Sequence, residues 1–259
     1  MSLQKDRGGL SRGIGLFKPV FIALFALFTF STLVTADDKS LHSQVTVIYT
    51  LKAPPLVTGD PDRPGYTYEL VEMMFRRAGL PYKIKIIPWK RAQRMAQQVP
   101  EAMIFPLTRT KTRNKLYNWS IPLHVAGAHF ITTNGQQLTR KAAKAKIIGA
   151  QSGSSWQEWL LENDFKNIVS PPHTGAQMAS LLCSGRIDAW FTTKRIAEAA
   201  LKDRDCPAQT YSPVIQYFDI FLASNKQIPN RYITLLKQAL RDIQSEGIQS
   251  QLRKKYYLF

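Results

Sequence analysis

Strand-like and helix-like segments alternate over the first part of the chain, and this alternation constrains the fold more than any other feature. Three apolar runs with strand character occupy residues 44–49, 82–87 and 102–105. Apolar side chains recur at helical spacing over residues 70–78, and a second helical segment separates the last two runs. Strands connected through helices pair in parallel by right-handed crossovers. The sequence therefore predicts a parallel sheet whose carboxyl strand ends share one rim.

A second series of the same kind follows. Its strand-like segments are residues 146–150, 168–170 and 187–191, and helical segments at residues 156–161 and 176–182 separate them. The chain then returns through another strand-like run and a long amphipathic helix. Two such series in succession indicate two lobes with a cleft between them.

The expected boundaries divide the chain into three parts. Residues 1–36 form a targeting segment, residues 37–125 together with 219–259 form the first lobe, and residues 126–218 form the second lobe. The fold class that follows is α/β, with a mostly parallel sheet flanked by helices in each lobe.

The first 36 residues have the parts of a secretory signal peptide. Four Lys and Arg side chains precede an apolar run that begins at Val20, and Val34-Thr35-Ala36 supplies a small-residue cleavage site. The alternative is a membrane anchor, but this run of about 14 residues is shorter than the roughly 20 that span a bilayer. The sequence thus predicts cleavage after Ala36 and a periplasmic mature protein.

The segment Leu107–Arg113 is the first candidate site. It follows the apolar run that Pro106 is expected to end, and it contains three hydroxyls and three cations. Open α/β sheets bind ligands at the carboxyl ends of their strands, and a guanidinium can hold a carboxylate by two parallel hydrogen bonds. We therefore expect Arg113 to anchor an anion with Thr108 beside it. The alternative is a basic surface loop without a ligand.

Other side chains are expected near the same cleft. Tyr49, Trp89 and Arg91 lie close to the rim of the first sheet, although Trp89 is equally consistent with a core position and Arg91 with a solvated helix face. Ser154 and Ser155 precede a helix in the second series. Backbone N–H groups and hydroxyls at such a helix start can bind an anion, while ordinary N-capping explains the same residues without a ligand.

The charge balance favours an anionic partner. The chain has 35 basic and 18 acidic residues, a net charge of +17, and removing the four basic residues and one acidic residue of 1–36 lowers it only to +14. Acidic ligands, anionic membranes and nucleic acids are attracted to such a protein. The charges are scattered without a long basic run, which argues against nucleic acid. The four His residues show no metal spacing, and no cofactor is expected.

Cys183 and Cys206 are the two cysteines of the chain. Because an exported protein meets an oxidising compartment, two such cysteines often pair. The sequence favours a disulfide between them over the alternative of two buried free thiols.

The order of these motifs resembles the family 3 bacterial extracellular solute-binding proteins of the polar amino acid type. The resemblance covers nearly all of the mature chain. The shared pieces are, in chain order, Pro54-Pro55, residues 65–70, Pro88-Trp89, Thr110-Lys111-Thr112-Arg113, the aromatic-Ser-x-Pro segment at residues 119–122, Gly153-Ser154-Ser155, Gly185-Arg186-Ile187-Asp188 and the closing pattern of residues 217–257.

The resemblance implies a two-lobed periplasmic binding protein fold of type II that closes on its ligand like a hinge. In the family the Arg of a Thr-x-x-Arg motif holds the ligand carboxylate, a role that falls to Arg113. The accompanying hydroxyls correspond to Thr108, Ser154 and Ser155. Where amino acid binders place an acidic residue for the ligand's ammonium group, this chain has Thr193. A carboxylate or other anion without an ammonium group therefore fits the chain better than a standard α-amino acid.

Three functions remain open at this point. The preferred one is a monomeric, non-enzymatic periplasmic binding protein that captures a small polar, carboxylate-bearing ligand and delivers it to an ABC permease in the inner membrane. The second is a soluble sensing subunit for a membrane receptor, which would use the same fold and site. The third is a dehydratase of cyclic carboxylic acids. It requires a general acid or base with a tuned pKa, and the expected rim residues include no Asp, Glu or His.

Overall fold

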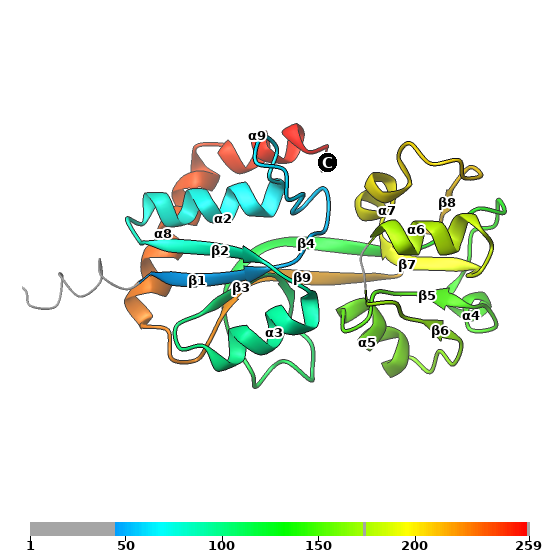
Figure 1. Cartoon of the computed structure of the whole chain (residues 1–259), viewed down its shortest axis with the longest axis horizontal. Coiled ribbons are helices and arrows are strands. Elements are labelled where there is room, and N and C mark those ends of the chain that lie inside the picture. Colours follow the sequence, from blue (N-terminus) through cyan, green and yellow to red (C-terminus); the bar gives the residue numbers. More distant parts are fainter. Residues whose placement is uncertain (1–44, 173–174, 258–259) are drawn as a thin grey trace, which may run out of the picture. The chain divides into compact units, whose positions relative to one another are not determined.

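The computed structural model describes residues 45–172 and 175–257, and Figure 1 shows the elements that they form. The predicted signal peptide, residues 1–36, lies outside the described residues and remains a prediction. None of the helices in the described ranges combines the length and the apolar character that a membrane span requires.

The first elements alternate as the sequence predicts. They are β1 (Thr46–Thr50), α2 (Tyr66–Arg77), β2 (Tyr82–Ile86), α3 (Trp89–Gln98) and β3 (Met103–Thr108). β1 pairs in parallel with β2, from Thr46 opposite Tyr82 to Thr50 opposite Ile86, and it also pairs in parallel with β3. The predicted parallel pairing of these three strands is confirmed.

The second series forms a similar unit. Its elements are α4 (Arg140–Ala143), β5 (Ile148–Gly149), α5 (Ser155–Glu162), β6 (Ile168–Val169), α6 (Gly175–Cys183), β7 (Ala189–Thr193), α7 (Lys194–Leu201) and β8 (Thr210–Tyr211). β5 pairs in parallel with both β6 and β7. The short α4 and β8 have no counterpart in the sequence-based expectation, because four and two residues are too few to establish a period.

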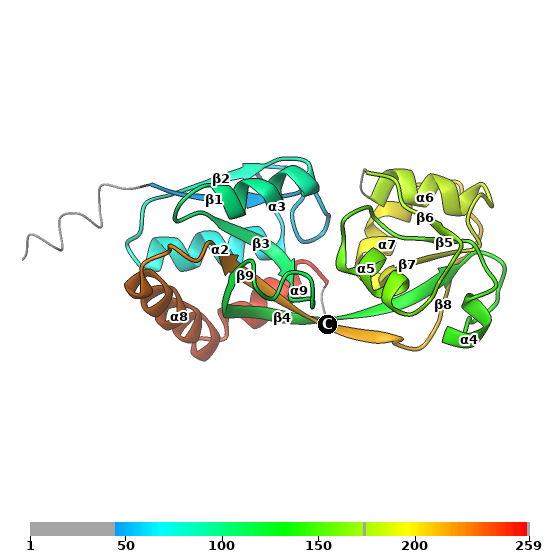
Figure 2. The same ribbon diagram turned by 90° about the horizontal axis from the view of Figure 1, so that it is seen from below.

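Two long strands connect the two series. They are β4 (Asn118–Thr132) and β9 (Gln216–Ser224). They pair antiparallel, with Ile121 opposite Leu222 and Ala128 opposite Gln216. β9 also pairs with β3, and β4 with β7, so the strands follow the order β2-β1-β3-β9-β4-β7-β5-β6. Figure 2 shows β4 and β9 running from one group of elements to the other.

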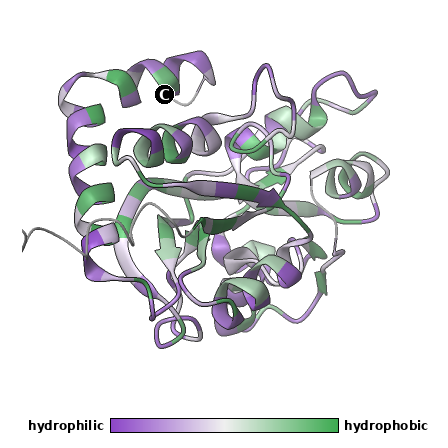
Figure 3. Ribbon diagram, turned by 60° about the vertical axis from the view of Figure 1, so that its left-hand side comes forward, coloured by the Kyte–Doolittle hydropathy of each residue, from purple (hydrophilic) through white to green (hydrophobic). Residues whose placement is uncertain are grey.

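Apolar side chains pack in separate clusters on the two sides of this connection. On the first, Leu70 and Met74 of α2 pack with Leu236 and Ile243 of α8 (Asn230–Ser245), and a short basic helix, α9 (Ile248–Lys255), follows. On the second, Phe130, Phe191 and Trp156 belong to one cluster. Figure 3 shows the helices alternating between hydrophobic and hydrophilic residues, as expected of helices that bury one face.

One sequence-based boundary is wrong. Pro106 does not end the third strand, because β3 continues to Thr108. The pairing of β3 with β9 shifts register between Ile104 and Leu107, and Pro106 lies inside that irregularity. Proline has no N–H for a regular ladder, and a bulge is one of the few places where a sheet accommodates it. Leu107 and Thr108 therefore belong to a strand and not to the loop.

Cys183 at the end of α6 and Cys206 form a disulfide across a sequence separation of 23 residues. The partly buried side chains of both pack against a cluster that contains Leu182 and Leu201. The disulfide therefore ties the chain after α7 to the end of α6.

We expect removal of this disulfide to destabilise the protein without changing its fold. Cross-linking two residues 23 apart restricts the unfolded chain, and the loss in Cys183→Ser/Cys206→Ser should be about 3 kcal/mol in the free energy of unfolding. Urea unfolding of the double variant and of the oxidised wild-type protein measures the difference. Identical midpoints and slopes for the two proteins would contradict the expectation.

Candidate functional site

Arg113 lies in the turn that follows β3, and its side chain is buried although it is charged. Only 4% of the side chain is exposed. Its Nη1 donates to the carbonyl oxygen of Thr108 at 3.3 Å, which fixes the guanidinium beside the end of β3. The backbone N–H of Arg113 donates to Thr110 Oγ1 at 3.3 Å. The side chain therefore turns back from the loop toward the carboxyl end of the sheet.

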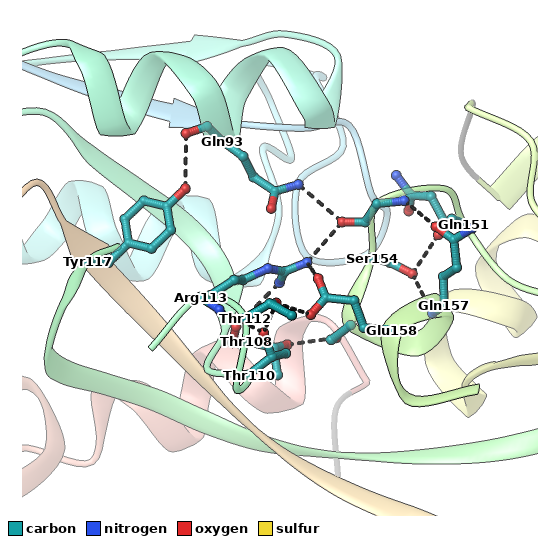
Figure 4. A network of polar contacts seen from close by, with 12 residues as sticks. Gln93, Thr108, Thr110, Thr112, Arg113, Tyr117, Gln151, Ser154, Gln157 and Glu158 are labelled. Carbon is teal, nitrogen blue, oxygen red and sulfur yellow. Dashed lines mark hydrogen bonds and ion pairs between the residues drawn. The ribbon is translucent and has the colours of Figure 1, made fainter. Parts of the chain in front are cut away.

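The guanidinium also contacts the second series of elements (Figure 4). Arg113 Nη2 donates to the carbonyl oxygen of Gly153 at 2.9 Å and to Glu158 Oε1 at 2.5 Å. Thr112 Oγ1 donates to the other oxygen of the same carboxylate at 2.7 Å. Glu158 thus holds two residues of the Thr110-Lys111-Thr112-Arg113 motif from the other side.

Two further hydrogen bonds join the same segments. Ser155 Oγ donates to Thr108 Oγ1 at 3.0 Å, and Gln93 Nε2 donates to the carbonyl oxygen of Gly153 at 3.1 Å. The Gln93 backbone carbonyl accepts from Tyr117 Oη at 2.9 Å (Figure 4). The middle of α3, the end of β3 and the start of α5 with the preceding Gly153 are therefore joined by direct hydrogen bonds.

A small cavity of about 60 Å³ lies between these segments. Three residues that line it, Arg113, His124 and Gln151, each have a buried nitrogen, Nε, Nδ1 and Nε2 in turn, without a hydrogen-bond partner among the described residues. Buried polar atoms are rarely left unpaired, and each unpaired one costs free energy comparable to a lost hydrogen bond. Three such residues around one cavity are the arrangement expected of a site that a polar ligand completes.

The ionisable side chains of the described cavity lining are Arg113 and His124. None of the described residues that line it is Asp or Glu, while Arg113 is a cation. Desolvation lowers the pKa of Arg113 and the nearby Glu158 carboxylate opposes that shift, so the guanidinium remains charged. Burial, assisted by the positive charge of Arg253, lowers the pKa of His124 to about 4. The imidazole is therefore neutral at pH 7.

The structure brings six of the eight sequence-predicted site residues to this cavity. They are Trp89, Thr108, Arg113, Ser154, Ser155 and Thr193. The other two lie elsewhere. Tyr49 is buried in the apolar cluster around Leu107, and Arg91 is exposed on α3.

The hydroxyls of Ser154 and Thr193 are the N-caps of α5 and α7. Ser154 Oγ accepts from the backbone N–H of Gln157 at 3.2 Å, and Thr193 Oγ1 accepts from that of Ile196 at 3.3 Å. Capping and lining of the cavity are compatible, because both side chains also border the empty space. Ser154 therefore caps α5 and also lines the cavity, so the N-cap role does not exclude contact with a ligand.

Three residues of this arrangement are absent from the sequence-based site. Glu158, Gln151 and His124 lie on α5, after β5 and on β4. Glu158 meets Arg113 across 45 residues of chain, and no local pattern signals such a pair. The polar segment between β5 and α5 was a signal for Gln151. Among residues 45–172 and 175–257, no group of three His, Cys, Asp or Glu side chains is placed to hold a metal ion.

The family model of the bacterial extracellular solute-binding proteins, family 3, matches residues 45–259. The chain belongs to this family. The match covers every element described above, and it confirms the resemblance that the motif order indicates. A search of curated proteins finds no match.

Solved structures share the fold of this family 3 protein at low sequence identity. The arginine-, lysine-, histidine-binding protein ArtJ from Geobacillus stearothermophilus is 20% identical, with a TM-score of 0.72 over 83% of this chain and 95% of its own. A histidine kinase sensor domain with similarity to periplasmic binding proteins is 14% identical, with a TM-score of 0.74 over 84% and 97%. The ancestral amino acid-binding protein AncCDT-1, a precursor of cyclohexadienyl dehydratase, is 17% identical, with a TM-score of 0.69 over 82% and 94%. These similarities establish the two-lobed α/β fold.

The buried His124 predicts a loss of stability in acid. The folded protein keeps His124 neutral down to a pH of about 4, while the unfolded chain binds a proton near its ordinary pKa of 6.5. Stability is therefore lost as the pH falls from about 6.5 toward 4. Each pKa unit corresponds to about 1.4 kcal/mol, so we expect His124 to contribute about 1–3 kcal/mol to the difference between pH 7 and pH 4.5.

Urea unfolding of His124→Asn at the two pH values tests this expectation. The free energy of unfolding of the variant should fall less than that of the wild-type protein. Val125→Ala, at an exposed neighbouring position, is the matched control and should retain the wild-type difference. If His124→Asn lost as much free energy of unfolding between pH 7 and pH 4.5 as the wild-type protein, His124 would not be the source of the acid sensitivity.

Proposed function

We propose that this family 3 protein captures a small carboxylate without an ammonium group and delivers it to an ABC permease of the inner membrane. The observation that carries the proposal is the buried Arg113, whose Nε has no partner among the described residues. It lines a cavity whose described lining contains no Asp or Glu. A charged guanidinium is costly to bury, and a carboxylate oxygen on Nε would add a charge-assisted hydrogen bond. The predicted signal peptide and a periplasmic location are part of the same proposal.

The lining of the same cavity is also the reason for proposing a ligand without an ammonium group. An α-amino acid would bring a cation next to Arg113, and the described lining has no carboxylate to compensate it. Glu158 is close, but its oxygens are engaged by Arg113 and Thr112. A 2-hydroxy acid presents the same carboxylate with a neutral hydroxyl, which Thr108 or Ser155 can hydrogen-bond.

Capture in this proposal needs two lobes that move. The lobes are those expected from the sequence, residues 37–125 with 219–259 and residues 126–218. Closure would take place about β4 and β9, the two strands that pass between them, and the Ser155–Thr108 and Arg113–Gly153 hydrogen bonds would form on closing. In this proposal the protein acts as a monomer. It also acts without turnover, because His124, which lines the cavity and is held neutral by a pKa of about 4, is a weak base.

Matched ligand pairs test the ligand class. Lactate and alanine differ in the hydroxyl or ammonium group at carbon 2, as do 3-phenyllactate and phenylalanine. We expect isothermal titration to detect the hydroxy acid of at least one pair and to give weaker binding for its amino counterpart. Tight binding of the amino acids with none of the hydroxy acids would contradict the proposal.

Arg113→Lys tests the anchor with the same titrations. Lysine keeps the charge and loses the planar fork, and breaking a buried charge-assisted contact costs about 2 kcal/mol or more, which is roughly a 30-fold loss of affinity. Arg94→Ala, at an exposed position of α3, is the control and should bind as the wild-type protein does. Unchanged affinity in Arg113→Lys would place the ligand elsewhere.

A further inference from the structure

A larger cavity adjoins the one at Arg113. It measures about 510 Å³, against about 60 Å³ at the guanidinium. The two share four lining residues, which are Ala53, Gln151, Trp156 and Ile196. The smaller cavity therefore has room for only a small part of a ligand next to the guanidinium. The larger one lies within the usual range of small-molecule pockets.

The interior of the larger cavity is mainly apolar. Trp156, Trp190 and Met178 line it and are almost fully buried, with Thr192 as a buried polar neighbour. The side chain of Trp156 is held by an edge-to-face contact with Phe218, whose ring centroid is 4.6 Å from its own. The charged residues of the described lining are exposed and so belong to its rim, namely Lys52, Lys202, Asp203 and Arg204. An apolar interior favours an uncharged ligand body by removing it from water.

Gln151 lies where the two cavities meet. Its Nε2 is buried without a partner in the described part of the chain, and the residue lines both spaces. A ligand whose carboxylate reaches Arg113 and whose body enters the larger cavity would pass Gln151. An oxygen on the carbon next to the carboxylate would then accept a hydrogen bond from the Gln151 amide, which would otherwise remain unpaired.

A third cavity, of about 380 Å³, is also lined by His124 and has a different character. Its cations Lys194 and Arg253 are exposed, and Arg195 is paired with Glu198 at 2.8 Å. Half or more of the side chains of Val125 and Tyr217 at its edge is exposed. A second anionic group of a dicarboxylate would be directed there. The buried apolar walls and the unpaired Gln151 favour the larger cavity over this one.

We infer that the ligand is a monocarboxylate with an apolar body, aromatic or branched, and with a hydrogen-bond acceptor next to the carboxylate. This inference rests on the proposed function and adds the specificity-determining residues: Trp156, Trp190 and Met178 for the body, and Gln151 for the acceptor. The body occupies the larger cavity, and the carboxylate lies at Arg113.

Ala199→Phe tests the larger cavity directly. Ala199 lies on α7, lines this cavity and is exposed, so a phenyl group there fills part of the space without disturbing the core. Ala208→Phe makes the same change at an exposed position outside the three cavities and is the matched control. Displacement titration compares three ligands that share the 2-hydroxycarboxylate group. Lactate adds only a methyl group, 3-phenyllactate adds an apolar body, and 2-hydroxyglutarate adds a second carboxylate.

We expect the wild-type protein to bind 3-phenyllactate at least tenfold more tightly than lactate and than 2-hydroxyglutarate. In Ala199→Phe the affinity for 3-phenyllactate should fall to that for lactate, with lactate itself unchanged, and Ala208→Phe should behave as the wild-type protein.

Equal affinity for lactate and 3-phenyllactate would overturn the inference alone, and so would tighter binding of 2-hydroxyglutarate or an Ala199→Phe variant that keeps the preference for 3-phenyllactate. Failure of all three hydroxy acids to bind, with an amino acid bound instead, would overturn the proposed function together with it.

Discussion

The hydrogen bonds of the buried Arg113 guanidinium hold the candidate site together. A charge in a low-dielectric interior is tolerated only when its donors are satisfied. Here Thr108 satisfies one side of the group, and Gly153 and Glu158 satisfy the other. Because those partners come from both βα series, the same group that would bind the ligand also joins the two series. Its Nε has no partner among the described residues and is a donor that a ligand would use.

The scaffold explains why these groups meet. Parallel strands end on a common rim, so the chain after β3 delivers Arg113 to the same edge as the start of α3. The second parallel unit delivers Gly153 and Glu158 in the same way through the loop after β5 and the first turn of α5. β4 and β9 span both units as an antiparallel pair, which gives the two rims a common support. The candidate site is thus a product of strand direction more than of any single motif.

Sequence patterns anticipate the parts that rest on local periodicity. The order of strands and helices, the parallel pairing of β1 with β2 and β3, and the family follow from spacing and motifs. The Cys183–Cys206 disulfide follows from the presence of two cysteines in a chain that is expected to be exported. Pro106 was misleading, because a bulge in the pairing with β9 places it inside β3. Sequence patterns do not identify Gln151 and His124. What marks these two residues is a buried nitrogen without a hydrogen-bond partner among the described residues, and this can be seen only in the packed structure. The pairing of Arg113 with Glu158 likewise depends on contacts between distant segments.

In the proposed function, Arg113 reserves Nε for the carboxylate of the ligand. The ¹H–¹⁵N resonance of the Arg113 Nε–H group reports on this contact. It can be assigned by its loss in Arg113→Lys and followed while 3-phenyllactate is added. We expect a downfield shift and slower exchange with solvent at saturation, while the corresponding resonance of Arg94 stays in place. An Arg113 resonance that does not move while the ligand binds would show that the carboxylate does not reach Nε.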